Sequence, residues 1–309
     1  MLSALVYKST GSWYVTKTAD GNLYNARLKG VLKIGGTTST NPIAVGDWVE
    51  MEMENELEKT TTITEIKDRK NYIARVSPHN KNQHHIIASN LDQSLLFATL
   101  KDPKTSNGFI DRFLVSCEAY HLPAIIIFNK ADLYKKKEIE KFEHLKGVYE
   151  QVGYTVVLAS LLNRQGVDEL KELLRNKTTL LSGHSGVGKS SLINSIFPEL
   201  KLRTTEVSNW SGKGMHTTTF AEMFDLPLGG KAIDTPGIRE LGLVDITKQE
   251  LSHYFPEMRA RLNGCKFNNC MHINEGDCAI KKAVNDGGID TDRYVSYLTI
   301  LDTMTDKAY

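Results

Sequence analysis

The stretch LLSGHSGVGKSSLIN, residues 180–194, decides the fold of this chain. It begins as an apolar, strand-like run, continues as G-x-x-x-x-G-K-S from Gly183 to Ser190, and ends as a helical segment. Glycines in this pattern allow successive backbone N–H groups to surround phosphates, and the N-terminus of the following helix adds partial positive charge. The stretch therefore predicts a phosphate-binding loop between a strand and a helix of an α/β domain.

The same motif assigns roles to individual residues. Lys189 is expected to reach the β- and γ-phosphates and to take part in catalysis, and the Ser190 hydroxyl to coordinate Mg²⁺. The residues expected to contact the nucleotide here are Gly183, His184, Ser185, Gly186, Val187, Gly188, Lys189, Ser190 and Ser191.

A second apolar run ends in AIDTPG, residues 232–237. Asp234 at the end of that run can hold the Mg²⁺ shell, and the N–H of Gly237 can sense the γ-phosphate. Such a pair of motifs is typical of nucleoside triphosphatases.

The segment SGKGMHTTTF, residues 211–220, lies between these motifs and has the character of a switch loop. Thr218, with Thr217 as the alternative, is expected to complete the Mg²⁺ coordination in the triphosphate state. Ile238 stands where Ras-type enzymes place the glutamine that orients water, so intrinsic hydrolysis should be slow. His216 is a candidate replacement with a titratable ring, although a loop histidine can equally face solvent or RNA.

The base is predicted to bind at NKAD, which follows the apolar run PAIIIF. Asp132 can accept hydrogen bonds from N1–H and the 2-amino group of guanine, Asn129 can tie this loop to the phosphate loop, and the Lys130 stem can pack over the purine. The loop LASLLNRQG resembles the fifth GTPase motif with its Ser-Ala pair inverted to Ala159 and Ser160, whose backbone amides are expected to contact the nucleotide.

The order of these motifs is unusual. Ordinary GTPases run phosphate loop, switch I, switch II, base loop and fifth loop, whereas here the base loop and the fifth loop come first (G4-G5-G1-G2-G3). This order predicts a circular permutation, which is tolerable because domain termini usually lie at the surface and near one another. Switch II then runs directly into the C-terminal block, so the nucleotide state can act on that block through the chain.

Three blocks are predicted. Residues 1–70 contain short strand signals separated by Gly, Asn and Pro, which favour an OB-type β-barrel, although an SH3-like barrel would give the same pattern. Residues 71–243 alternate apolar runs with helical stretches, which indicates a mostly parallel α/β sheet. Residues 244–309 carry helical segments around a cysteine cluster.

Two crossover helices are predicted from apolar residues at helical spacing: Ile110, Phe113, Leu114 and Cys117 in one, and Ile139, Phe142, Leu145 and Tyr149 in the other.

The cysteine cluster has the spacing C-x₄-C-x-H-x₅-C, formed by Cys265, Cys270, His272 and Cys278. Four such ligands suit a closed tetrahedral Zn²⁺ site of the Cys₃His kind. Reduced, uncoordinated thiols are the alternative. A catalytic zinc is less expected, because four protein ligands leave no open position for water.

Composition limits which classes of protein this chain can belong to. The chain has 309 residues, of which 40% are apolar and 24% charged, and a net charge of only +1, so any RNA contact must use local patches. It has no run near the roughly 18 apolar residues of a membrane span, and we expect a cytoplasmic monomer. One candidate patch is RKNYIAR, in which Arg69, Lys70, Tyr72 and Arg75 suit RNA contact as well as an ordinary surface.

The motif order, together with GHSGVGKSSLIN, GMHTTT, DTPGIREL and the downstream cysteines, resembles the RsgA (YjeQ) family of circularly permuted GTPases. The resemblance spans nearly the whole chain and includes VGDWV, ITEIKDRKNYIAR and ASNLDQ. It implies an OB-fold domain, a permuted GTPase and a zinc domain with the same four ligands. It further implies that the protein binds the small (30S) ribosomal subunit and its 16S rRNA, and hydrolyses GTP to GDP and phosphate during late maturation of that subunit. The alternative function is a nucleotide-gated RNA- or ribosome-binding module in which hydrolysis is incidental, an interpretation motivated by Ile238.

Overall fold

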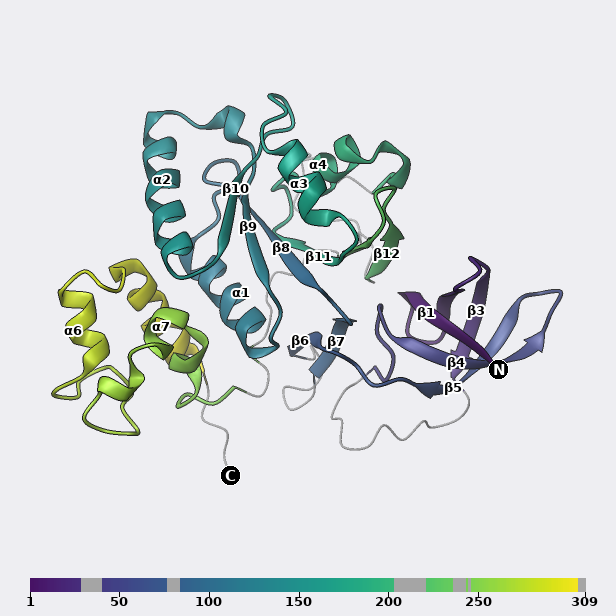
Figure 1. Cartoon of the computed structure of the whole chain (residues 1–309), viewed down its shortest axis with the longest axis horizontal. Coiled ribbons are helices and arrows are strands. Elements are labelled where there is room, and N and C mark those ends of the chain that lie inside the picture. The colour runs from purple at the N-terminus through teal and green to yellow at the C-terminus, as the bar shows by residue number, and fades with distance from the viewer. Residues whose placement is uncertain (29–40, 77–83, 203–220, 236–242, 244–245, 305–309) are drawn as a thin grey trace, which may run out of the picture.

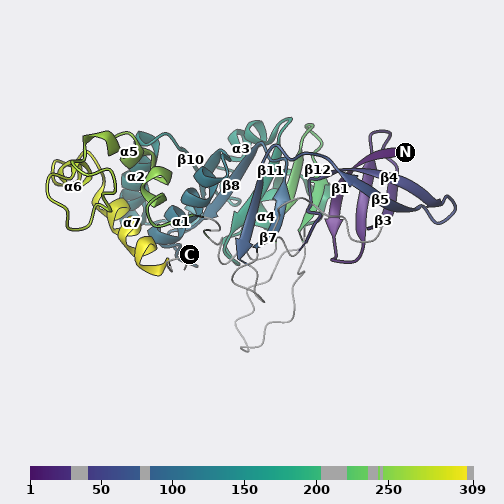
Figure 2. The ribbon, with the colours of Figure 1, turned by 90° about the horizontal axis from the view of Figure 1, so that it is seen from below.

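The computed structural model describes residues 1–28, 41–76, 84–202, 221–235, 243 and 246–304. Three groups of elements lie in a row: a β-barrel at one end, a sheet flanked by helices in the middle, and the C-terminal helices at the other end (Figures 1 and 2). None of the helices within the described ranges combines the length and the apolar character needed to cross a membrane.

The N-terminal barrel is closed. Its strands are ordered β1-β2-β3-β5-β4, and β4 pairs again with β1. Strands β3 and β5 are parallel, whereas the other neighbours are antiparallel. This Greek-key order is that of an OB fold, so the SH3-like alternative is excluded. The strands are β1 (Leu2–Ser9), β2 (Tyr14–Thr18), β3 (Leu23–Leu28), β4 (Trp48–Asn55) and β5 (Thr60–Ile66).

The central sheet has the spatial order β10-β9-β8-β11-β13-β12, in which only β12 is antiparallel to its neighbour. The chain winds from β8 toward β10 on one side and from β11 toward β13 on the other, so the direction of winding reverses between β8 and β11. Open α/β sheets bind ligands at the carboxyl ends of the strands at such a point. The strands are β8 (Gln93–Ala98), β9 (Ala124–Phe128), β10 (Thr155–Leu158), β11 (Thr178–Gly183), β12 (Glu222–Asp225) and β13 (Lys231–Asp234).

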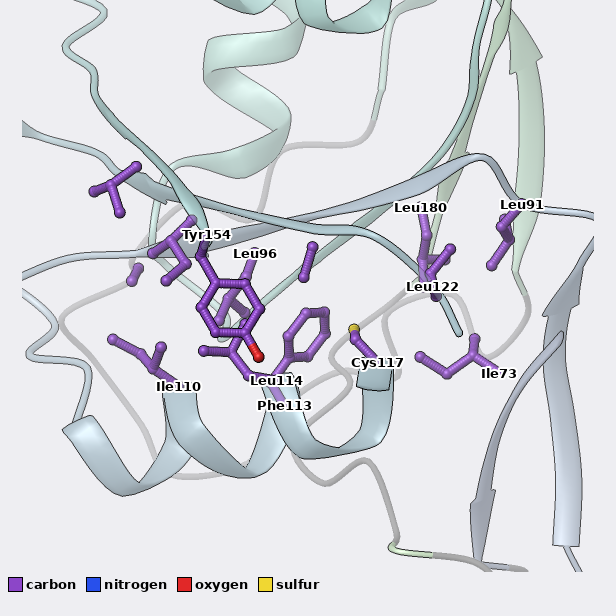
Figure 3. Packing of buried hydrophobic residues seen from close by; sticks show 14 of the residues in the cluster. Ile73, Leu91, Leu96, Ile110, Phe113, Leu114, Cys117, Leu122, Tyr154 and Leu180 are labelled. Carbon is purple, nitrogen blue, oxygen red and sulfur yellow. The ribbon is translucent and has the colours of Figure 1, made fainter. Parts of the chain in front are cut away.

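Helices cover both faces of this sheet. Side chains alternate along β8, so that Leu96 packs with α1 (Asn107–Ala119) and α2 (Lys136–Gln151) while Leu95 packs with α3 (Val167–Leu174) and α4 (Lys189–Ile196). The predicted apolar residues of α1, Ile110, Phe113, Leu114 and Cys117, all enter the first core, as Figure 3 shows.

The predicted apolar face of α2 is correct for three residues and wrong for one. Phe142, Leu145 and Tyr149 are buried, but Ile139 in the first turn is 47% exposed. The apolar stripe of α2 therefore begins one turn later than predicted.

The barrel and the central sheet are continuous. Strand β1 pairs with β12 at Lys8 and Glu222, whose side chains also form an ion pair with an N–O distance of 3.1 Å. The Tyr7 hydroxyl donates to Asp225 Oδ1 at 2.6 Å, and Lys17 Nζ donates to Asp225 Oδ2 at 2.6 Å. The barrel is thus joined to the strand that follows the predicted switch loop.

A hairpin of β6 (Tyr72–Val76) and β7 (His84–Ser89) follows the barrel, and the segment that leads to it contains an internal ion pair. Asp47 is fully buried and accepts hydrogen bonds from Arg69 Nε at 2.7 Å, Arg69 Nη2 at 2.6 Å and Ser89 Oγ at 2.6 Å. The Arg69 guanidinium is therefore used inside the protein. Neither interpretation of RKNYIAR, RNA contact or ordinary surface, included this role.

The C-terminal block is helical, as predicted, but its first helical segment is broken. A 3₁₀-helix (Leu251–Tyr254) is separated from α5 (Pro256–Arg259) because Pro256 lacks the N–H needed to continue a helix. The 3₁₀-helix Leu262–Gly264, α6 (Ala279–Asn285) and α7 (Thr291–Thr303) complete the block. Its core includes Val115 of α1, so the block completes its apolar packing on the central α/β domain.

A buried ionic network fastens α7 to α5 within the block and to α1 of the central domain. Arg293 of α7 donates from Nη1 to Asp111 Oδ1 at 2.7 Å, and from Nε and Nη2 to Glu257 at 2.8 and 3.0 Å. Its guanidinium carbon lies 4.8 Å from the centre of the Phe255 ring. All three charged side chains are at least 96% buried.

We expect Arg293→Leu to destabilise the packing of α7 on α1 by about 3–5 kcal/mol, because it leaves two buried carboxylates without their cation. Hydrogen exchange of the α7 amides measures the free energy of this opening. The matched control is Arg175→Leu, which removes an exposed ion pair with Glu172 and should cost under about 1 kcal/mol. Equal effects of the two variants would contradict a structural role for the network.

Candidate functional site

The phosphate loop lies where the motif predicts, between the end of β11 and the start of α4. Gly188 caps α4 with a φ of +82°, and a Cβ there would lie 2.7 Å from Asn129 Nδ2. A Cβ on Gly183 would lie 2.5 Å from the Phe97 carbonyl oxygen. Both positions therefore need glycine, one for its close approach to β8 and the other for its approach to the base loop.

The base loop is tied to the phosphate loop by Asn129. This buried side chain donates from Nδ2 to the carbonyl oxygen of Val187 at 2.9 Å, the connection expected from the sequence. Tyr134 also fixes the base loop. Its hydroxyl donates to the Asn129 carbonyl at 2.8 Å and accepts from Leu100 N–H at 3.0 Å. Burial raises the pKa of Tyr134 to about 12, so the hydroxyl remains a donor at neutral pH.

The predicted guanine reader Asp132 lies beside the fifth loop. The Ser160 hydroxyl donates to Asp132 Oδ1 at 2.6 Å. The amides expected to contact the nucleotide are already used: Ala159 N–H donates to Phe128 O at 2.8 Å and Ser160 N–H donates to Gln165 O at 3.1 Å. These amides hold the loop in place while the Ser160 side chain orients the carboxylate. A contact of Ala159 and Ser160 with the nucleotide stays a prediction.

Lys130 and Lys189 have different partners. Lys130 adopts a left-handed backbone conformation, and its ammonium group donates to the carbonyl oxygen of Asp102. Lys189 of the phosphate loop forms a direct ion pair with Asp234, at the end of the neighbouring strand β13. This pair places a cation and an anion side by side, between the start of α4 and the end of β13.

The remaining candidates divide into two groups. Ser190 and Ser191 lie in the first turn of α4, next to Lys189. His216, Thr217, Thr218, Gly237 and Ile238 lie outside the described residues. The structure thus brings together the phosphate loop, the base loop, the fifth loop and Asp234 at one edge of the sheet.

The four predicted metal ligands also meet. Their ligand atoms all lie within 4.8 Å of one another. Cys265 Sγ lies 3.9 Å from Cys278 Sγ, and His272 Nδ1 lies 3.4 Å from Cys278 Sγ and 3.7 Å from Cys265 Sγ. A tetrahedral zinc ion with ordinary bond lengths separates its ligand atoms by about 3.5–3.8 Å. The geometry therefore fits a closed tetrahedral site, with no position left for a reacting water.

Three residues that support this cluster were missed by sequence reasoning. The hydroxyls of Tyr294 and Tyr297 donate to the carbonyls of His272 and Met271 at 2.5 and 2.8 Å. The Glu275 carboxylate accepts from Met271 N–H at 2.7 Å and from Ile273 N–H at 2.8 Å. The spacing of the two tyrosines, one helical turn apart in α7, was the available signal.

Comparisons with known proteins agree with this geometry. The chain matches the family model described as RsgA GTPase over residues 66–244 and that described as RsgA N-terminal domain over residues 4–60. It is 52% identical to the small ribosomal subunit biogenesis GTPase RsgA of Cytophaga hutchinsonii, covering 97% of this chain and 98% of that one. It is 48% identical to the protein of the same name in Christiangramia forsetii, covering 99% and 98%.

Two solved structures share the whole architecture. The crystal structure of YjeQ from Thermotoga maritima superposes with a TM-score of 0.77 at 31% identity, covering 97% of both chains. YloQ, described as a circularly permuted GTPase, superposes with a TM-score of 0.72 at 28% identity, covering 98% of this chain and 94% of that one. The predicted permuted fold is confirmed, and the chain belongs to the RsgA GTPase family.

Proposed function

We propose that this protein hydrolyses GTP during maturation of the small ribosomal subunit, acting in the cytoplasm as a monomer that contacts 16S rRNA. The observation that carries the proposal is the guanine-nucleotide constellation between an OB barrel and a Cys₃His block, in a chain whose relatives bear that function in their names. The units proposed to act together are residues 1–70, 71–243 and 244–309.

Within the site we propose a division of roles. Asp132, oriented by Ser160, reads guanine, and Asn129 fixes the phosphate loop against the base loop. Lys189 leaves Asp234 to contact the β- and γ-phosphates when nucleotide binds. Ser190 and Asp234, together with Thr218, would hold Mg²⁺, which neutralises phosphate charge. His216 is the proposed water-orienting group.

We expect Asp132→Asn to shift the preference of the protein from GTP toward XTP, because an amide can donate to the 2-oxo group of xanthine where a carboxylate only accepts. Sites with buried acceptors reject a wrong base by roughly 10⁴-fold, so the shift should be large. Competition between the two nucleotides measures it. The control is Asp168→Asn on the exposed surface of α3, which should leave the preference unchanged. Full GTP selectivity in Asp132→Asn would remove the base-reading role.

We also propose that the Cys₃His cluster binds one structural Zn²⁺. Cys270→Ser should lower bound zinc well below one equivalent and loosen the C-terminal block, because the metal contributes folding free energy there. Elemental analysis of the purified protein measures the zinc content. Cys117→Ala, which changes a buried cysteine of the GTPase core, should leave it at one equivalent. Full occupancy in Cys270→Ser would contradict the assignment.

A further inference from the structure

Phe109 in the first turn of α1 contacts the phosphate loop directly. Its ring centre lies 3.6 Å from that of His184, with 31° between the ring planes. This separation is shorter than the usual 4.5–7 Å of aromatic pairs, so the two faces are in close contact. His184 directly follows Gly183 and occupies one of the variable positions of the G-x-x-x-x-G-K-S motif. The motif therefore does not account for a histidine here.

Two of the contacts that hold this loop lie close together in sequence. At one end Asn129 donates to the Val187 carbonyl, and at the other the His184 ring rests on Phe109. Only Ser185 and Gly186 lie between these anchors. A loop fixed close to its bound conformation loses less entropy when a ligand binds, which raises affinity without any new contact to the ligand.

The turn of α1 that carries Phe109 is fixed by a helix cap, by core packing and by an ion pair. Its backbone N–H donates to the Ser106 side chain that caps α1, at 3.2 Å. The next residue, Ile110, is buried in the core under the sheet, as Figure 3 shows. Asp111 then joins the buried network of Arg293 in α7. One helical turn thus meets the phosphate loop, the sheet and the C-terminal block.

We propose that Phe109 is a positioning residue for the phosphate loop, acting through its stack on His184. The proposal rests on the nucleotide site proposed above. Phe109 contacts no nucleotide in this assignment; it preorganises the segment whose backbone N–H groups face the phosphates, and it joins that segment to the helix on which the C-terminal block is packed.

The test is a double-mutant cycle read out as GDP affinity, with fluorescent GDP as the probe and the full-length protein throughout. Phe109→Leu and His184→Ala should each weaken binding by about 2- to 10-fold, the range expected for one aromatic pair. The double variant should bind no more weakly than the weaker single variant, because both changes remove the same contact. Phe109→Tyr keeps the ring and should restore wild-type affinity.

Phe142→Leu is the matched control, since it removes a ring from the core against which Phe109 packs, where Phe142 lies edge-on to Phe128 and not against His184. It should lower the melting temperature as Phe109→Leu does, yet leave GDP affinity unchanged. Additive losses in the cycle, or unchanged affinity in His184→Ala, would overturn the proposal. Failure of the wild-type protein to bind GDP would instead overturn the nucleotide site itself, so the two failures are distinguishable. Should Phe109→Leu not fold, His184→Ala and Phe109→Tyr still decide the matter.

Discussion

A Lys189→Ala variant is expected to lose GTP hydrolysis by at least about 10²–10³-fold, both alone and with small ribosomal subunits present. Removing one electrostatic contact to developing charge in an active site costs this much in rate. The expected loss is at the upper end here, because Asp234 would remain beside the phosphates with no cation to offset its charge. Single-turnover hydrolysis of radiolabelled GTP measures the effect.

The matched control for Lys189→Ala is Lys171→Ala. Lys171 lies on α3, where it pairs at 3.7 Å with the exposed Asp168 and contacts no part of the nucleotide site described above. Its removal should leave the rate constant within about 2-fold, since exposed ion pairs contribute little. A Lys189→Ala protein that hydrolyses GTP as fast as this control would show that the phosphate loop is not the site of the reaction.

Much of the fold could be predicted because its determinants are local. The phosphate loop, the base loop and the cysteine spacing are each contained in a short segment, and their order along the chain sufficed to predict the permutation. The topology of the barrel could not be predicted in the same way, since strand lengths and turns fit two barrel types. The parallel pairing of β3 with β5, a contact between distant segments, settles it.

The contacts that the sequence did not indicate are made to long-range partners. Arg69 has the composition of an RNA contact, but Asp47 from another segment binds its guanidinium. The inverted Ala159-Ser160 pair was interpreted through backbone amides, whereas the hydroxyl of Ser160 reaches Asp132 from a separate loop. Neither partner is near in sequence, so no periodicity or spacing indicates it.

The second large effect is expected from the small ribosomal subunit. Isolated protein should hydrolyse GTP slowly because Ile238 cannot polarise water, and a group supplied or repositioned by a partner can contribute roughly 10³–10⁵ in rate. Both ends of the molecule are connected to the nucleotide site: the barrel through β1 and β12, and the C-terminal block through α1. RNA held by both ends could therefore set the geometry of the intervening switch segments.

Two further readouts belong to this prediction. Stimulation should fall as salt is added, because each RNA phosphate neutralised by the protein releases counterions. His216→Ala separates two roles for that histidine: loss of the stimulated rate with unchanged subunit binding supports catalysis, whereas weakened binding places the residue at the RNA interface.

The most direct measurement is the single-turnover rate constant of GTP hydrolysis by the wild-type protein alone, with saturating small subunits, and with large subunits. The account predicts an increase of about 10³-fold or more with small subunits and none with large ones. Equal rate constants for the free and the subunit-bound protein would contradict it, and would favour a nucleotide-gated binding module in which hydrolysis is incidental.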